Sequence, residues 1–362
     1  MTHGTIILGH VFKLMPRAHG ESLDNTSSTG RPSRVLRRWS PFGALVFAHL
    51  AGRHRLRDVV TSMASPSEAL ASRGVTPPQR ATRAEANERR PAALYQRLLA
   101  TFDARGQAVA PGHRCRFKNP LCSVDSTTSS LGLHRCPWAR DRTATGAITG
   151  QTLLDHSGDL PACVVSTAGK RSDLAIARGR PRPKGSLVAM DRGDLDERCR
   201  CRLPQDPVDF VIRQKRHAQF TVTTRVAGSG HHGVTSDQHS MRRGHNGQAD
   251  PDVLRRVGYR DPATGQHDVL WTHACHLAAA TMAALYQARW PIERFFNAIQ
   301  QDLQLKTCLG TSENAVMTHI WVALLTSRLL AFLRCKSGLG LSFPQRLRLL
   351  HIHLFDRRNL VD

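Results

Sequence analysis

The sequence is poor in acidic residues and in lysine, and it lacks the segments that mark membrane or secreted proteins. Its 362 residues include 28 Asp and Glu against 51 basic residues, of which seven are lysine and 44 arginine, for a formal charge of +23. The longest apolar stretch, 316–333, contains His319 and Arg328, so we expect a buried core helix and no membrane partner. The apolar run Thr5–Leu8 is too short for a signal peptide, which favours a cytoplasmic protein.

The sequence also lacks paired cysteines. Its nine cysteines are scattered singly, and no two of them have CxxC spacing. Cys199 and Cys201 stand one residue too close together for that spacing, which argues against a zinc ribbon. An odd number of unpaired cysteines is typical of reduced thiols in the cytosol.

Arginine is the strongest compositional signal that is present. Its planar guanidinium group pairs with two phosphate oxygens at once, and a large positive field concentrates polyanions near the protein. Basic residues also cluster at 31–38 and in the RQKR segment at 213–216. We therefore predict a nucleic acid partner. The alternative is that an arginine-rich proteome inflates the positive charge.

The first 105 residues predict a small helical region that binds DNA. Pro41 suits the first turn of a helix that continues through the apolar run Phe42–Leu50. A second helical pattern covers about 80–104, and the basic cluster at 31–38 would provide the surface for DNA. The alternative is a pair of solvated surface helices.

Residues 106–335 predict an α/β core. The apolar runs Leu121–Val124 and Leu187–Met190 are each followed at once by an aspartate, a pattern that favours strands with acids at their ends. We expect a mostly β insertion at about 197–275 and a helical tail at 336–362.

Three acids are candidates for catalysis and metal binding: Asp125, Asp191 and Glu293. Glu293 lies in the segment LYQARWPIERFF. In a continuous helix, the spacings of three, four and seven residues from Tyr286 through Arg289 and Glu293 to Gln300 place these side chains on one face. One interpretation is a surface helix with an Arg289–Glu293 pair. The other is a helix that delivers a carboxylate to a metal site beside DNA.

These residues resemble a known signature. Tyr-x2-Arg-x3-Glu-x6-Lys marks the insertion-sequence-four family of DDE transposases, and this chain matches it up to Gln300, which replaces the lysine. The segment LYQARWPIERFFNAIQQDLQLKTCLGTSENAVMTHIWVAL is similar to that family throughout. FKNPLCSVDSTT and VAMDRGDLD resemble the segments around its two aspartates, and FGALVFAHLAGRHRLRDVV its N-terminal region. The resemblance covers nearly the whole chain.

The resemblance implies a ribonuclease H-like core with a β insertion and two bound Mg²⁺ or Mn²⁺ ions at Asp125, Asp191 and Glu293. Two cations held by carboxylates activate water and stabilise the leaving oxygen of a phosphodiester. The implied activity is cut-and-paste transposition, in which water cuts at the transposon end and the freed 3′-hydroxyl attacks target DNA. The implied partners are the terminal inverted repeats, the target DNA and a second copy of the chain, at the nucleoid.

The resemblance also implies which residues contact DNA. Tyr286 and Arg289 of the signature would hold a phosphate near the reacting strand. The remaining candidates for DNA contact are Trp290, Gln300, Arg213, Lys215 and Arg216.

The departures from the family leave other hypotheses open. Gln300 removes a cation that could pair with a phosphate, and Asp194 adds a negative charge three residues from Asp191. One alternative is therefore a catalytically impaired derivative that acts only as a DNA-binding protein. Another is a ribonuclease H-like nuclease acting on RNA or junction DNA. The Tyr-Arg-Glu pattern argues against the nuclease, because plain hydrolysis needs no clamp on a strand end.

Overall fold

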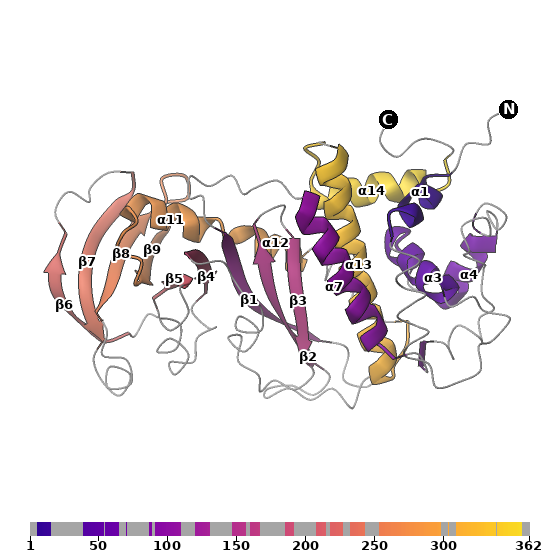
Figure 1. Cartoon of the computed structure of the whole chain (residues 1–362), viewed down its shortest axis with the longest axis horizontal. Helices are drawn as coiled ribbons and strands as arrows, with labels where there is room; N and C mark the ends of the chain where they lie inside the picture. The colour runs from indigo at the N-terminus through magenta and orange to yellow at the C-terminus, as the bar shows by residue number, and fades with distance from the viewer. Residues whose placement is uncertain are drawn as a thin grey trace. The chain divides into compact units, whose positions relative to one another are not determined.

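The structure is a computed structural model. It describes residues 6–15, 39–53, 55–64, 70, 87–88, 91–109, 120–130, 147–156, 160–166, 185–191, 208–214, 218–226, 232–242, 253–297, 303, 309–337 and 339–356. The chain divides into two compact units, whose elements are labelled in Figure 1. The helical unit comprises Met1–Ala110, Thr128–Ile148 and Phe295–Asp362, and the sheet unit comprises Pro111–Thr127 and Thr149–Arg294.

The sheet unit is built on a mixed sheet. The described strands form one nine-stranded sheet, in which they lie side by side in the order β3-β2-β1-β4-β5-β9-β8-β7-β6. Their bounds are β1 Leu121–Ser130, β2 Ala147–Asp155, β3 Leu160–Ser166, β4 Ser186–Met190, β5 Val208–Arg213, β6 Phe220–Arg225, β7 Val234–Arg242, β8 Leu254–Arg260 and β9 His267–Thr272.

The middle of this sheet is parallel. Strand β4 pairs in parallel with both β1 and β5, whereas β5, β9, β8, β7 and β6 pair successively in antiparallel fashion, as do β2 and β3. All five residues of β4 are buried, as expected for a parallel strand covered on both faces. Strand β5 falls within the predicted β insertion at 197–275, but its pairing makes it part of the parallel series, so β6–β9 form the antiparallel extension.

Helix α11 (Ala279–Gln287) covers one face of the sheet. Its residues Met282, Leu285 and Tyr286 are buried together with side chains from β1, β4, β5 and β9. Full burial of a Met or Leu side chain stabilises a fold by about 1.5–3 kcal/mol, so these contacts hold the helix firmly on the sheet. The same packing sets the position of Tyr286 beside the ends of the parallel strands.

The helical unit is organised around one long apolar helix, α13 (Glu313–Ser337), which packs against α7 and α3. In the described part of the chain, α13 alone is long and apolar enough to cross a membrane by length and composition, but it is mostly buried inside this unit. The predicted buried helix at 316–333 is thus confirmed. Among the described residues, this unit also contains the helices α1 Ile7–Lys13, α3 Trp39–Leu50, α4 Leu56–Ala64, α7 Ala93–Val109 and α14 Phe343–His353.

The structure groups the chain differently from the predicted domains 1–105, 106–335 and 336–362. The backbone amides of Ile7 and Leu8 donate to the carbonyls of Asp356 and Leu354, so the two ends of the chain belong to one unit. Helix α13, which the prediction assigned to the catalytic core, packs against the N-terminal helices of the same unit. These contacts join residues far apart in the sequence, and no local pattern indicates them.

Candidate active site

The parallel strands bring three polar residues into line. The register pairs Val124 of β1 with Met190 of β4, and Met190 with Ile212 of β5. The residues that directly follow Val124, Met190 and Ile212 are Asp125, Asp191 and Arg213. Because neighbouring strands lie about 4.8 Å apart, this register aligns the backbones of the three residues across adjacent strands.

The two aspartates occupy different local positions. Asp191 directly follows β4, as the sequence predicts. Asp125 was also predicted to follow a strand, but β1 continues to Ser130, so Asp125 lies inside it. The prediction ended the strand too early because the residues after Val124 are polar. The side chain of Asp125 lies outside the described residues, so only its backbone position is established.

The signature residues come from two helices, where the sequence predicted one. Helix α11 ends at Gln287, and helix α12 runs from Trp290 to Asn297. Pro291 has no backbone N–H and cannot continue the hydrogen bonds of α11, which explains the break. Across the break, the amide of Arg289 donates to the carbonyl of Tyr286 at 3.0 Å. Arg289 therefore lies between the helices, and Glu293 lies in the first turn of α12.

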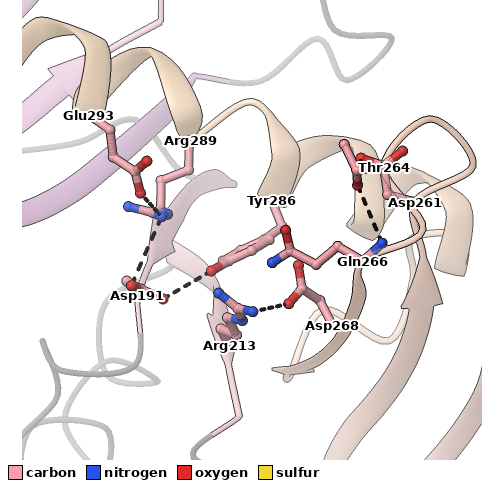
Figure 2. A network of polar contacts seen from close by, with 9 residues as sticks. All are labelled: Asp191, Arg213, Asp261, Thr264, Gln266, Asp268, Tyr286, Arg289 and Glu293. Carbon is pink, nitrogen blue, oxygen red and sulfur yellow. Dashed lines mark hydrogen bonds and ion pairs between the residues drawn. The ribbon is translucent and has the colours of Figure 1, made fainter.

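Tyr286, Arg289, Glu293 and Asp191 form one polar cluster (Figure 2). The hydroxyl of Tyr286 donates to Oδ1 of Asp191 at 3.1 Å. A terminal nitrogen of Arg289 lies 2.5 Å from Oε1 of Glu293 and 4.0 Å from Oδ2 of Asp191. One guanidinium group thus faces two carboxylates that are 102 residues apart in the sequence.

The cluster buries its donors and leaves its carboxylates open. The side chain of Arg289 is 4 % exposed, whereas those of Asp191 and Glu293 are 36 % and 53 % exposed. Burial, reinforced by the charge of Asp191, raises the pKa of Tyr286 above its usual value, so the hydroxyl keeps its proton. Burial acts to lower the pKa of Arg289, but its interactions with Tyr286, Asp191 and Glu293 raise it overall. The tyrosine is therefore a neutral donor and the arginine a permanent cation.

Arg213 borders this cluster through an ion pair of its own. Its guanidinium lies 2.5 Å from the carboxylate of Asp268 on β9, and Figure 2 shows the pair next to Tyr286. The sequence assigned Arg213 to a basic cluster for DNA, but it did not single out Asp268. No local signal marks Asp268, because the pair forms only when β9 returns to lie beside β5.

Of the remaining predicted DNA contacts, the structure describes Trp290. Trp290 stands at the start of α12 and is 42 % exposed, so part of this residue is accessible to a partner. Three of the predicted contacts lie outside the described residues: Lys215, Arg216 and Gln300.

The donor set of the cluster fits a divalent cation. Asp191 and Glu293 supply carboxylate oxygens, the ligands that Mg²⁺ prefers, and both carboxylates reach solvent. The guanidinium of Arg289 stands between them as a positive charge, so this position already accommodates a cation. Within the described side chains, no group of three metal-binding residues occurs. The third carboxylate that the sequence predicts, Asp125, has its side chain outside the described residues.

Comparisons with known proteins show what the chain is similar to. The model of the Transposase DDE domain matches residues 116–329, and that of a domain of unknown function (DUF4372) matches residues 3–76. A protein of Geobacillus stearothermophilus named as a probable transposase for insertion sequence element IS5377 is 30% identical over 238 residues, which cover 63% of this chain and 61% of that protein. The chain thus spans about three fifths of that relative's length. A protein of Sinorhizobium fredii named as transposase y4zB is 27% identical over 281 residues, covering 76% and 78%.

Proposed function

Because the chain belongs to the DDE transposase family, we propose that it cuts DNA at the ends of an insertion sequence and joins the freed 3′-hydroxyl to target DNA. The observation that carries this proposal is the cluster in which Arg289 lies between the carboxylates of Asp191 and Glu293. The register that aligns Asp125 with Asp191 supports a third carboxylate at the same place. We assign the catalytic triad to these three acids.

We further propose a ribonuclease H-like core. Two features support it: a parallel middle of the sheet with acids in register, and an antiparallel extension of β6–β9 between Asp191 and Glu293 in the chain. The N-terminal helices would then form a small DNA-binding region, residues 1–105. The Tyr-Arg-Glu spacing supports membership of the insertion-sequence-four subfamily, with Gln300 in place of its lysine.

The proposed cofactors are two Mg²⁺ or Mn²⁺ ions held by Asp125, Asp191 and Glu293. When bound, such ions supply the charge that activates a water and stabilises the leaving oxygen of a phosphodiester. Tyr286 donates to Oδ1 of Asp191, and Oδ2, which Arg289 faces at 4.0 Å, would be the ligand oxygen. The packing of α11 on the sheet and the break at Pro291 orient Glu293 toward the same position.

The proposed DNA surface surrounds this site. Tyr286, Arg289 and the exposed Trp290 lie at the junction of α11 and α12, and Arg213 borders them. Lys215, Arg216 and Gln300 are further proposed contacts that rest on the sequence alone. The formal charge of +23 supports capture of a polyanion. We propose that the partners are the terminal inverted repeats, the target DNA and a second copy of the chain, at the nucleoid.

The test is cleavage of labelled DNA that carries the repeats bracketing the gene, with Mg²⁺ supplied. Glu293→Gln should slow cleavage by about a hundred- to a thousand-fold, since one removed group that stabilises transition-state charge costs two to three orders of magnitude. The matched control is Glu313→Gln, because Glu313 also lies in the first turn of a helix, α13, but outside the sheet unit. This control should cleave at the rate of the parent chain.

Two outcomes would contradict the proposal. Equal cleavage by Glu293→Gln and the parent chain would remove Glu293 from the active site. Specific binding of the repeats without cleavage by the parent chain, in Mg²⁺ or Mn²⁺, would favour the catalytically impaired, DNA-binding derivative.

A further inference from the structure

The guanidinium of Arg289 faces the carboxylates of both Asp191 and Glu293, where a cation shared by the two would bind. This group lies 2.5 Å from Glu293 and 4.0 Å from Asp191, and the side chain is almost fully buried. A divalent ion shared by these carboxylates would bind at about 2.0–2.5 Å from their oxygens. Such an ion and the guanidinium would therefore meet as like charges over the same pair of oxygens.

We propose that Arg289 is a placeholder cation, which holds Asp191 and Glu293 together before metal binds and competes with the metal for both carboxylates. The inference rests on the proposed function, because it takes these two acids as the metal ligands. It assigns Arg289 a role in the absence of DNA, in addition to its proposed contact with a phosphate. The residue is a positioning residue in this state.

Electrostatics explains why a placeholder would be needed. Asp191 and Glu293 place two negative charges near each other, and like-charged carboxylates repel or retain a proton when nothing neutralises them. Arg289 keeps its proton at every physiological pH, because guanidinium groups do not deprotonate in proteins. The single positive charge of Arg289 balances only one of the two carboxylates. A net negative charge therefore remains to attract a divalent ion.

The neighbouring donors do not compete in the same way. Tyr286 reaches Asp191 as a neutral hydroxyl and adds no positive charge to oppose a metal. Arg213 forms an ion pair with Asp268, so its charge is balanced within 2.5 Å. The competition should therefore depend on position 289.

The experiment measures Mn²⁺ affinity directly on the full chain without DNA, by calorimetry and by the Mn²⁺ spin-resonance signal. Arg289→Gln should bind Mn²⁺ about ten-fold more tightly than the parent chain, the effect of losing roughly one charged hydrogen bond. Arg289→Lys should fall between them, at about three-fold, since an ammonium group is a point charge and lacks the planar fork that can face two carboxylates.

The controls separate local competition from overall charge. Arg260→Gln removes one exposed positive charge from the end of β8 and should leave Mn²⁺ affinity unchanged within about two-fold, because screened surface charges interact weakly at a distance. Glu293→Gln should weaken Mn²⁺ binding. Circular dichroism on each variant checks that it is folded. If Arg289→Gln fails to fold, the three-fold tightening by Arg289→Lys carries the test.

The results distinguish a failure of the placeholder inference from a failure of the proposed metal site. Equal or weaker Mn²⁺ affinity in the Arg289 variants, with Glu293→Gln impaired, would overturn the placeholder and leave the proposed metal site standing. No Mn²⁺ binding by the parent chain or by any Arg289 variant would overturn both. Mn²⁺ binding by Arg289→Gln alone would be the strongest support for competition.

Discussion

Two arginine–carboxylate clusters of the sheet unit differ in which partner faces solvent. Arg255 of β8 donates from Nε and a terminal nitrogen to the two oxygens of Asp237 at 2.9 and 2.6 Å, and both side chains are buried. In the second cluster, Arg289 is buried but Asp191 and Glu293 are 36 % and 53 % exposed. We call Arg255 and Asp237, which are both shielded from solvent, the closed pair. We call Arg289, Asp191 and Glu293, whose carboxylates reach solvent, the open cluster.

The difference separates a structural ion pair from one suited to chemistry. Arg255 and Asp237 balance each other, and a remaining nitrogen of Arg255 donates to the backbone carbonyls of Cys275 and Leu277, just before α11. The closed pair thus fastens the start of α11 to the sheet. The open cluster has one cation for two carboxylates, so its spare negative charge is available to a further cation. A buried pair whose two charges balance has no spare charge to attract a ligand.

The largest expected effect on stability is therefore in the closed pair. Asp237→Ala leaves Arg255 buried without its counterion and should lower the free energy of unfolding by about 3–5 kcal/mol. Urea denaturation followed by circular dichroism measures it. The double variant Asp237→Leu with Arg255→Met removes both charges and should recover most of the loss. A loss below about 1 kcal/mol for Asp237→Ala would mean that the pair is not closed in solution, since uncompensated burial costs more than that.

An intermediate effect on the free energy of unfolding is expected for Tyr286, the neutral hydrogen-bond donor to Asp191 in the open cluster. Tyr286→Phe removes the hydroxyl that donates to Asp191 and should lower the free energy of unfolding by about 1.5–3 kcal/mol, the scale of a hydrogen bond to a charged group. The matched control is Tyr259→Phe, because the Tyr259 hydroxyl accepts a hydrogen bond from the neutral Gln287 at 3.2 Å. It should lose about half as much, since hydrogen bonds between neutral groups are weaker. Equal losses would mean that the Tyr286 hydroxyl gains no more from Asp191 than the Tyr259 hydroxyl gains from Gln287.

Local patterns in the sequence were sufficient for some of the elements that carry the site. Apolar runs before acids correctly placed β4 and Asp191, and Pro41 before an apolar run correctly placed α3. The spacing of Tyr286, Arg289 and Glu293 predicted that these side chains lie near one another, and hydrogen bonds and ion pairs place them in one cluster with Asp191. Each of these features depends on residues close together in the chain.

The errors arose where polar or distant residues decide the structure. The residues after Val124 continue β1 because they pair within a sheet, although they are polar and do not read as a buried strand. Pro291 ends the continuous helix that the spacing alone predicted. The Arg213–Asp268 pair depends on sheet order, and the shared unit of both chain ends depends on contacts across the whole sequence. Neither leaves a local signal.

The smallest expected effect on stability is at the residue that matters most for the proposed chemistry. Glu293→Gln should change the free energy of unfolding by less than about 1 kcal/mol, because Glu293 is 53 % exposed, so solvent screens its charge, and because Arg289 keeps Asp191 as a partner. Glu293 and Glu313 both stand in the first turn of a helix, so both lose a similar interaction with the helix dipole when replaced by Gln. The difference between Glu293→Gln and Glu313→Gln in urea denaturation therefore isolates the contact with Arg289. The loss at Glu293 could instead exceed the loss at Glu313 by 2 kcal/mol or more, on the scale of a buried charged hydrogen bond. Glu293 and Arg289 would then form a structural ion pair that stabilises the fold. The contrast with Asp237 and Arg255 would then fail, and with it the argument that the spare carboxylate is kept for a cation.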